Sequence, residues 1–395
     1  MSRSLESHLN GSAAPKRILS LSGGGVRGLI TLGILAALEA IYRDEVGDDD
    51  ARLCDHFDLI AGTSTGSIIA TALALGWSVA EIKSLYHEIC PILFKPNRRL
   101  GFLKPKFDRK HLEKVLESSL QDRDGKQITL GSDMLRTGLL ICAKRMDSDS
   151  AWVLTNNPAA KFYDAEPNQT WMPNKMFKLS SLILASAAAP TFLEPVMVDV
   201  GNTEKGYPSD LALFVDGGIS GHNCPALIAL QVATLDPYRF NWKTGEEHLS
   251  ILSLGTGQFR SKHDADEFRS LRTWKQALEA LKGLISESQR SVIKTMQAMS
   301  NPRSGAAWYL NSEVEGLEGT TMTPEPLFNF RHVDADIGDS EVERRLDLKG
   351  RDAKKIDSIG DGIRDMANGR KRNLVFCEQI GMSVGSELTR DDLFL

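Results

Sequence analysis

The first quarter of the chain combines short apolar runs, glycine-rich turns and helical periodicity. Residues 17–21 form a leucine and isoleucine run that ends near the glycines of 23–25, after which apolar residues recur at helical spacing through 29–41. A second apolar run, 57–61, leads into the turn sequence of 62–66 and then into another helical pattern. Each unit therefore predicts a strand, a tight turn and a helix, in that order.

Helix-capping residues and a proline indicate where helices begin and end in the same region. Gly76 suits a left-handed C-cap, and residues 78–81 have the serine and glutamate spacing of a capping box that starts the next helix. We expect Pro91 to end that helix, because proline removes a backbone donor.

Strand and helix patterns continue to alternate down the chain. Helical patterns cover 178–188, a segment opening at Pro225, and 271–299, and strand-like runs cover 138–146, 151–154, 196–200, 211–215 and 249–254. Because no repeat or low-complexity linker interrupts this order, we predict one α/β domain with a mainly parallel sheet. We expect a flexible leader over 1–16, a catalytic domain over 17–310, and a C-terminal extension over 311–395 packed on the same domain.

One uncharged stretch, residues 59–80, is long enough to cross a bilayer. We interpret it as a buried strand, turn and helix, since its first third is rich in glycine, serine and threonine and its apolar run breaks again at Gly76. The polar sequence of residues 1–16 lacks the apolar core of a secretory signal. Neither segment predicts a membrane span.

Composition narrows the class of partner. Apolar residues make up 42% of the chain and charged residues 25%, as in an ordinary folded domain. The net charge of −5 and a pI near 6.0 give no overall positive field that would attract DNA or RNA. The five cysteines are scattered without metal-site spacing, so we expect no metal, and reduced thiols in a cytoplasm.

The turn sequence of 62–66 fits the pattern Gly-x-Ser-x-Gly around Ser64. In this pattern Gly62 and Gly66 let the chain turn so sharply from strand to helix that the serine hydroxyl is exposed to a substrate. The helix behind Ser64 adds partial positive charge near the reacting oxygen. Taken alone, the pattern is equally compatible with a structural turn.

The glycines of 23–25 lie between a strand and a helix, so their amides are free to face an anion. That anion is either a nucleotide phosphate or the oxyanion of an attacked acyl carbonyl. A dinucleotide fingerprint can be fitted between Gly23 and Gly28, but dinucleotide folds do not require the second motif at 62–66.

A third motif, Asp216 followed by two glycines, comes directly after the strand-like run 211–215. On its own it is more typical of a capped turn. All three motifs, however, follow predicted strands, and open α/β sheets build their sites at the carboxyl edge. We therefore expect the glycine loop, Ser64 and Asp216 to meet at one edge of the sheet.

Together these motifs resemble the patatin-like phospholipase family. The resemblance rests on LSLSGGGVRG, GTSTG, the run ASAAAPTF at 185–192 and the late DGG, in this order, with a GTG at 255–257 also similar. It covers about residues 17–260. Ser22 is a departure, since many relatives have Asp at that position.

The resemblance implies a three-layer α/β/α fold with a mainly parallel central sheet, and a serine hydrolase of fatty-acyl esters that needs no cofactor. Carried onto this chain, Ser64 is the nucleophile and Asp216 completes a Ser–Asp dyad that acts through an acyl-enzyme. The family's oxyanion hole maps onto Gly23, Gly24, Gly25 and Arg27.

Two alternatives to this mechanism remain open. A Ser–Asp–His esterase needs a histidine after Asp216, and the candidates are His222, His248, His263 and His332. A non-catalytic lipid-binding or signalling module predicts loss of the dyad residues.

The resemblance also bears on partners and location. It implies a membrane phospholipid as substrate, reached from the cytoplasm by peripheral contact with the inner membrane. Some bacterial members resemble this chain in their extra C-terminal sequence and act as antiphage effectors switched on by cyclic oligonucleotides. A cyclic oligonucleotide activator and a homo-oligomer are therefore open expectations, and DNA or RNA binding is not expected. The basic residues of the tail could bind phosphates, but they are more typical of a solvated helix face.

The segment from Ile92 to Phe107 alternates leucine and phenylalanine with lysine and arginine and contains no acidic residue. It predicts either a lid over the Ser64 pocket that docks on lipid, or apolar residues folded onto the core with the cations in water.

Overall fold

The structure is a computed structural model, and it describes residues 3–95, 107–164, 169–201, 203, 206–259, 265–302, 321–350 and 352–395. Nine strands of this part form one sheet. Their bounds are β1 (Lys16–Leu21), β2 (Leu59–Thr63), β3 (Gly138–Arg145), β4 (Ser150–Thr155), β5 (Val196–Asp199), β6 (Leu211–Asp216), β7 (Leu249–Leu254), β8 (Asn301–Pro302) and β9 (Asn329–Val333).

The sheet is mainly parallel, as predicted. Its order is β5-β6-β3-β2-β1-β7-β9-β8, with β4 also paired to β3. Pairing is parallel from β3 through β2, β1, β7 and β9 to β8, and antiparallel where β4 and β6 pair with β3 and where β5 pairs with β6. Because β6 pairs only with residues 143–145 at the end of β3, it reaches the carboxyl edge of the parallel strands from the opposite direction.

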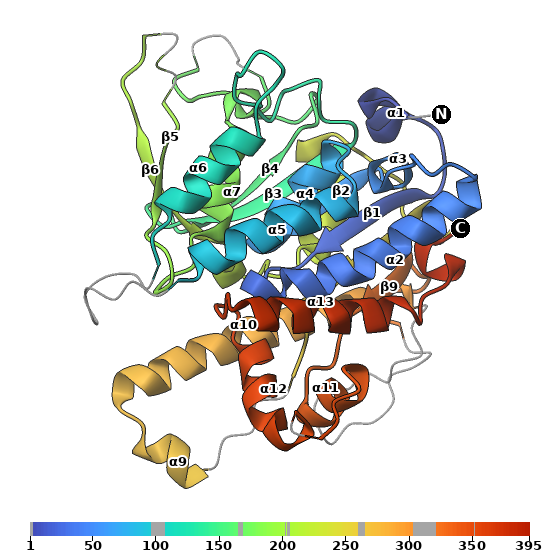
Figure 1. The fold of residues 1–395 in the computed structure, drawn as a ribbon. Helices are drawn as coiled ribbons and strands as arrows, with labels where there is room; N and C mark the ends of the chain where they lie inside the picture. The colour runs from blue at the N-terminus through green and yellow to red at the C-terminus, as the bar shows by residue number, and fades with distance from the viewer. Residues whose placement is uncertain are drawn as a thin grey trace.

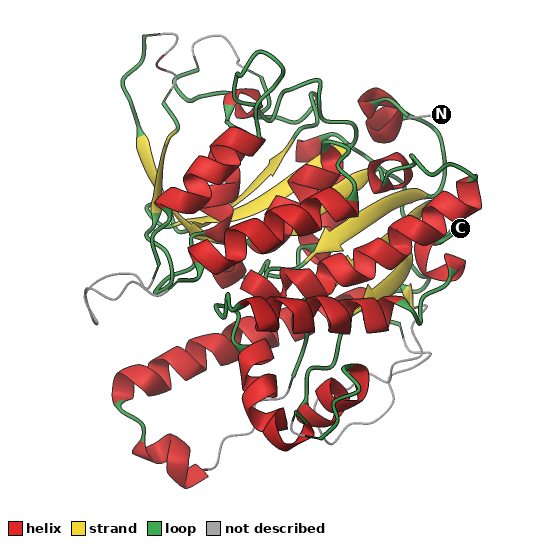
Figure 2. Ribbon diagram, in the orientation of Figure 1, coloured by secondary structure: helices red, strands yellow, loops and turns green. Residues whose placement is uncertain are grey.

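Helices cover both faces of this sheet (Figure 2). Their bounds are α1 (Leu5–Asn10), α2 (Gly28–Val46), α3 (Leu53–His56), α4 (Thr65–Ala74), α5 (Val79–Leu93), α6 (Lys110–Ser119), α7 (Leu179–Ala187), α8 (Ala226–Thr234), α9 (Ala265–Ser270), α10 (Thr273–Ala298), α11 (Asp339–Arg345), α12 (Ile356–Arg364) and α13 (Lys371–Gly385).

Side chains of the central strands alternate between two hydrophobic clusters, one on each face. Leu19 and Leu21 of β1 join the cluster that contains α2, α4, α5 and α7, whereas Ile18 joins the cluster beneath α8 and the end of α10. This alternation follows from the two-residue period of a strand. It produces the three-layer α/β/α arrangement expected from the resemblance.

The C-terminal helix α13 lies alongside α2 (Figure 1). Glycines permit this close approach, because a Cβ on Gly33 would lie 2.6 Å from Met382 N and one on Gly381 would lie 2.1 Å from Ile30 O. Within the expected C-terminal extension, β9 is a strand of the central sheet and α13 packs on the helix that follows the glycine loop.

Two local features differ from the sequence expectations. Residues 1–16, expected to be a flexible leader, contain α1, which is anchored because His8 and Leu9 are buried and the Arg3 guanidinium donates to Asp58 at 2.7 Å. Pro91 lies inside α5, which continues to Leu93. A proline this close to the end of a helix disturbs only its last turn.

Among the described helices, Gly25–Val46 alone is long and apolar enough to cross a membrane, and 72% of its most apolar window is buried inside the fold. That burial is typical of a core helix. The uncharged stretch at 59–80 forms β2, the following turn and α4, as we expected.

Candidate active site

Ser64 lies in the turn between β2 and α4, with φ 55° and ψ −127°. A positive φ is uncommon for a residue with a side chain and persists only where the surroundings enforce it. The flanking glycines have no room for a side chain, since a Cβ on Gly62 would lie 2.3 Å from Gly66 O and one on Gly66 would lie 2.2 Å from Leu21 O. The two glycines therefore permit the sharp turn that presents Ser64.

Asp216 is the last residue of β6, and its carboxylate faces Ser64. The Ser64 hydroxyl donates to Asp216 Oδ2 at 2.6 Å, and the Gly218 amide donates to Asp216 Oδ1 at 2.7 Å. Both side chains are buried. Residues separated by 152 positions in sequence thus form one hydrogen-bonded pair at the carboxyl edge of the sheet.

Burial raises the pKa of Asp216 to about 6, while the hydrogen bonds from Ser64 and Gly218 act in the opposite direction. Desolvation disfavours the charged carboxylate and so makes it a stronger base. This effect reduces the mismatch between an ordinary carboxylate and a serine hydroxyl.

The backbone of Ser64 is held by a residue to which the sequence assigned no role. Ser186, near the end of α7, accepts a hydrogen bond from the Ser64 amide at 2.8 Å and donates to Cys142 O at 2.5 Å. Ser67 donates its hydroxyl to Ser64 O at 2.6 Å. These hydrogen bonds hold the strained turn at Ser64 in place. In the sequence, the signal for Ser186 was its position in the run ASAAAPTF.

The three glycines of the loop after β1 are not equivalent. The Gly23 amide donates to Asn223 O and the Gly24 amide donates to Thr65 Oγ1, both at 3.1 Å. The Gly25 amide has no hydrogen-bond partner among the described residues. The loop lies directly against the serine, since a Cβ on Gly23 would lie 2.9 Å from Ser64 Cβ.

Arg27 follows this loop and is only 8% exposed. Its Nε has no hydrogen-bond partner in the described part of the chain. Burial lowers the pKa of Arg27, and the nearby carboxylates of Asp334 and Asp365 oppose that shift. A buried cation therefore follows the glycine loop, and carboxylates of the C-terminal segment favour its charged form.

A family profile described as patatin-like phospholipase matches residues 19–230. The chain belongs to the patatin-like phospholipase family. Patatin-17 of Solanum cardiophyllum is 30% identical over 269 residues, which are 65% of this chain and 64% of that protein. A cGAMP-activated phospholipase of Vibrio cholerae serotype O1 is 30% identical over 252 residues, 61% of this chain and 64% of that protein.

A third relative, the Probable inactive patatin-3-Kuras 1 of Solanum tuberosum, is 27% identical over 330 residues, 78% of this chain and 80% of that protein. Members of this family are lipid acyl hydrolases. The chain spans slightly less than two thirds of the length of Patatin-17 and of the Vibrio cholerae phospholipase.

The described histidines do not complete a triad with the patatin-like Ser64 and Asp216. His222 lies near the site, but its backbone oxygen accepts from Thr63 and burial lowers its pKa. His332 lies on β9 with Nδ1 at 3.2 Å from Ser253 Oγ. No histidine side chain in the described ranges hydrogen bonds Ser64 or Asp216, and His263 lies outside those ranges.

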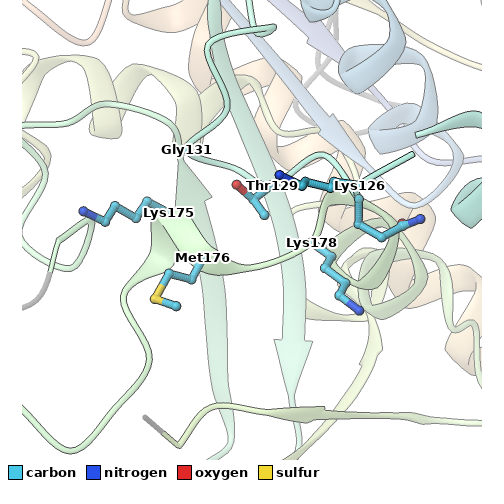
Figure 3. Close-up of a pocket in the computed structure, with 7 residues that line it drawn as sticks. Lys126, Thr129, Gly131, Lys175, Met176 and Lys178 are labelled. Carbon is cyan, nitrogen blue, oxygen red and sulfur yellow. The ribbon is translucent and has the colours of Figure 1, made fainter. Parts of the chain in front are cut away.

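A hollow of about 750 Å³ lies away from the patatin-like site, at the opposite end of α7 from Ser186. Lys126, Thr129, Lys175 and Lys178 are among its lining residues. Figure 3 shows the side chains of Lys175 and Lys178 pointing in different directions, and Lys175 also pairs with Asp164 at 2.6 Å. The hollow is therefore a surface feature separate from Ser64.

The basic residues of the C-terminal segment are partly neutralised. Arg331 pairs with Asp392, Arg344 with Glu341, Arg345 with Glu387 and Arg372 with Asp352. Arg351 lies outside the described residues, as do residues 96–106 of the segment expected to be either a lid or a core-packed loop. Among the described residues of this segment, Lys354, Lys355, Arg370 and Lys371 are exposed cations that form no ion pair.

Proposed function

We propose that this protein is a phospholipase of the A type that cleaves fatty-acyl esters of membrane phospholipids, with Ser64 as nucleophile and Asp216 as base. The observation that carries the proposal is the 2.6 Å hydrogen bond from Ser64 Oγ to Asp216 Oδ2 at a buried strand-to-helix turn. The family membership supplies the ester chemistry.

In the proposed first step, Ser64 Oγ attacks the ester carbonyl while Asp216 accepts the hydroxyl proton. The carbonyl oxygen becomes an oxyanion, and the Gly25 amide is the loop donor free to bind it. Gly23 and Gly24 shape the loop through their own hydrogen bonds, and Arg27 adds positive charge behind it. The tetrahedral intermediate then collapses: the ester C–O bond breaks, the leaving oxygen of the lysophospholipid takes the proton from Asp216, and the acyl group stays on Ser64.

In the second step, Asp216 accepts a proton from water as the water oxygen attacks the acyl-enzyme carbonyl. The Ser64 oxygen leaves, recovers its proton from Asp216, and the fatty acid departs. The same carboxylate thus serves both half-reactions. A carboxylate with a pKa near 6 is ionised at neutral pH and able to act in both.

A non-catalytic role is the competing proposal, because one relative is named as probably inactive. Against it, this chain keeps the serine, the aspartate and an unengaged loop amide in one arrangement. A lipid-binding module would not need the strained backbone at Ser64.

Regulation by a cyclic oligonucleotide belongs to the proposal because two relatives are cGAMP-activated phospholipases. The exposed cations Lys354, Lys355, Arg370 and Lys371 are candidate phosphate contacts. In this proposal the protein acts from the cytoplasm on the inner membrane as an antiphage effector, with homo-oligomerisation an open part of the activation step.

The test is mass spectrometry of products released from mixed phospholipid bilayers, with and without cGAMP, comparing the wild type with Ser64→Ala. We expect free fatty acid and lysophospholipid from the wild type only, with more product when cGAMP is present. Absence of both products under both conditions contradicts hydrolysis. Equal release with and without cGAMP contradicts only the activator.

Peripheral membrane contact through residues 92–107 has a separate test. Replacing Arg98 and Arg99 together by Glu should weaken binding to anionic vesicles and slow bilayer hydrolysis, because cations attract anionic headgroups. Hydrolysis of a water-soluble short-chain ester should change little. Equal loss on both substrates contradicts the lid.

A further inference from the structure

A turn of the C-terminal segment, residues 365–369 between α12 and α13, lies directly against the glycine loop. The Val26 amide donates to Met366 O at 2.9 Å. Gly25 has φ 61°, and a Cβ placed on it would lie 2.1 Å from the same Met366 oxygen. The two backbones are therefore in the closest contact that a glycine allows.

This contact adjoins the loop amide that remains available to a ligand. Gly23 and Gly24 use their amides in hydrogen bonds within the fold, whereas the Gly25 amide has no partner among the described residues. The Val26 amide and the Gly25 carbonyl belong to the same planar peptide unit. A displacement of Met366 would consequently rotate or shift the Gly25 backbone.

The turn is fixed on its far side as well. Asp365 Oδ1 accepts the Ala367 amide at 3.0 Å, and the Asn368 side chain donates to Gly362 O at 3.1 Å. Gly369 abuts α5, because a Cβ on it would lie 2.4 Å from Cys90 O. The turn is thus wedged between the glycine loop and the end of α5.

The same part of the chain supplies charge near Arg27. Asp365 of the turn and Asp334, which follows β9, both act on the buried guanidinium. Packing and charge from residues beyond 330 therefore converge on the loop that precedes α2.

We propose that residues 365–369 are a positioning element of the active site, which holds the Gly25 amide where the oxyanion forms. This proposal rests on the proposed function and extends it to a segment beyond the matched residues 19–230. Oxyanion donors lose effect when they move by a fraction of an ångström. A change in α12 or α13 would reach the reaction centre through this turn.

The experiment adds one methyl group where residues 365–369 contact the end of α5. Gly369→Ala must push the turn away from Cys90 O, whereas the control Gly283→Ala adds the same methyl on α10 with nothing within 4 Å. We measure kcat and KM on a water-soluble short-chain ester, the rate at which a fluorophosphonate labels Ser64, and the thermal midpoint.

For Gly369→Ala we expect kcat and the labelling rate to fall by roughly 10-fold or more, because both need the oxyanion donor in place. We expect KM to stay near the wild-type value and the protein to remain folded at the assay temperature. The control variant should match the wild type in kcat, KM and labelling rate, with an equal or slightly higher thermal midpoint, because alanine favours a helix interior more than glycine does. A folded Gly369→Ala protein with wild-type kcat and labelling rate overturns the proposal. A loss of kcat that follows only a loss of thermal stability overturns it too.

Asn368→Ala decides the question if Gly369→Ala does not fold, because it removes the bond to Gly362 O without adding bulk. A reduced kcat and labelling rate at unchanged thermal midpoint supports the positioning element, and wild-type rates overturn it. If the wild type itself is not labelled at Ser64, the proposed function fails first, which separates the two failures.

Discussion

Two buried carboxylates lie at the carboxyl edge of the same sheet, and burial raises the pKa of each to about 6. Asp216 ends the antiparallel strand β6 and accepts a hydrogen bond from the Ser64 hydroxyl. Asp334 follows the parallel strand β9 and accepts the amides of Gly257 and Ala335 at 2.6 and 2.8 Å. Its second oxygen has no hydrogen-bond partner within the described residues.

The comparison shows that a raised pKa does not by itself identify a catalytic base. Desolvation is the first cause of the shift in both residues, so it reports burial. What differs is the donor. Asp216 faces a hydroxyl on a strained turn, whereas Asp334 ties down the backbone after β7 and lies near a neutral histidine, His332, whose pKa burial lowers to about 4.

The largest expected difference between Asp216 and Asp334 is the effect of their substitution on turnover. Asp216→Asn should lower kcat on a short-chain ester by roughly 10³-fold, because the carboxamide cannot accept the Ser64 proton. Asp334→Asn keeps an oxygen for the two amides and should lower kcat by less than about 10-fold. Both variants are measured beside Ser64→Ala, and the double variant Ser64→Ala/Asp216→Asn should be little worse than either single change. A severe loss in Asp334→Asn with activity retained in Asp216→Asn would reverse the two roles.

Much of the fold could be predicted because β1, β2, β3 and β7 are short runs rich in apolar residues that end at turn residues. The run 249–254 matches β7, and 271–299 exceeds α10 by only a few residues. The direction of β6 could not be predicted, since an apolar run has the same pattern in either orientation. Helix α1 was missed because its anchor is a distant contact, from Arg3 to Asp58.

The meeting of Ser64 and Asp216 was predictable because each has its own local motif at a strand end. The roles of Ser186 and Met366 were not. Ser186 bonds a residue 122 positions away, and Met366 acts through its backbone oxygen, which any residue type possesses. The sequence alone did not distinguish the three loop glycines from one another. In the described chain, however, the Gly25 amide is the one of the three that has no hydrogen-bond partner.

The next difference concerns pH. Since Asp216 must be ionised to act as a base, kcat/KM on a soluble ester should rise close to tenfold per pH unit below about 6 and level above it. Asp334→Asn should keep this limb at the same pH, because Asp334 touches neither the serine nor the substrate in the proposed mechanism. Two results would contradict the assignment of Asp216 as the base. One is a shift, in Asp334→Asn, of the pH at which kcat/KM begins to fall; the other is a wild-type kcat/KM that does not change from pH 5 to 8.

The smallest effect is on stability, and its sign is the same for both carboxylates. Each pKa is raised from 3.8 to about 6, so the folded state binds the proton more tightly than the unfolded state does. The resulting stabilisation is fully present below about pH 4 and is lost as pH rises through about 6. One such group contributes at most about 3 kcal/mol across that interval.

The free energy of unfolding, measured with urea at pH 4.5, 5.5 and 6.5, should therefore fall with pH less steeply in Asp334→Asn than in the wild type. Asp216→Asn should flatten the slope similarly, and it should also lower kcat by roughly 10³-fold. Stability would then depend on burial alone, whereas activity would depend on geometry. An unchanged slope in both variants would mean that neither carboxylate has a raised pKa in the folded protein.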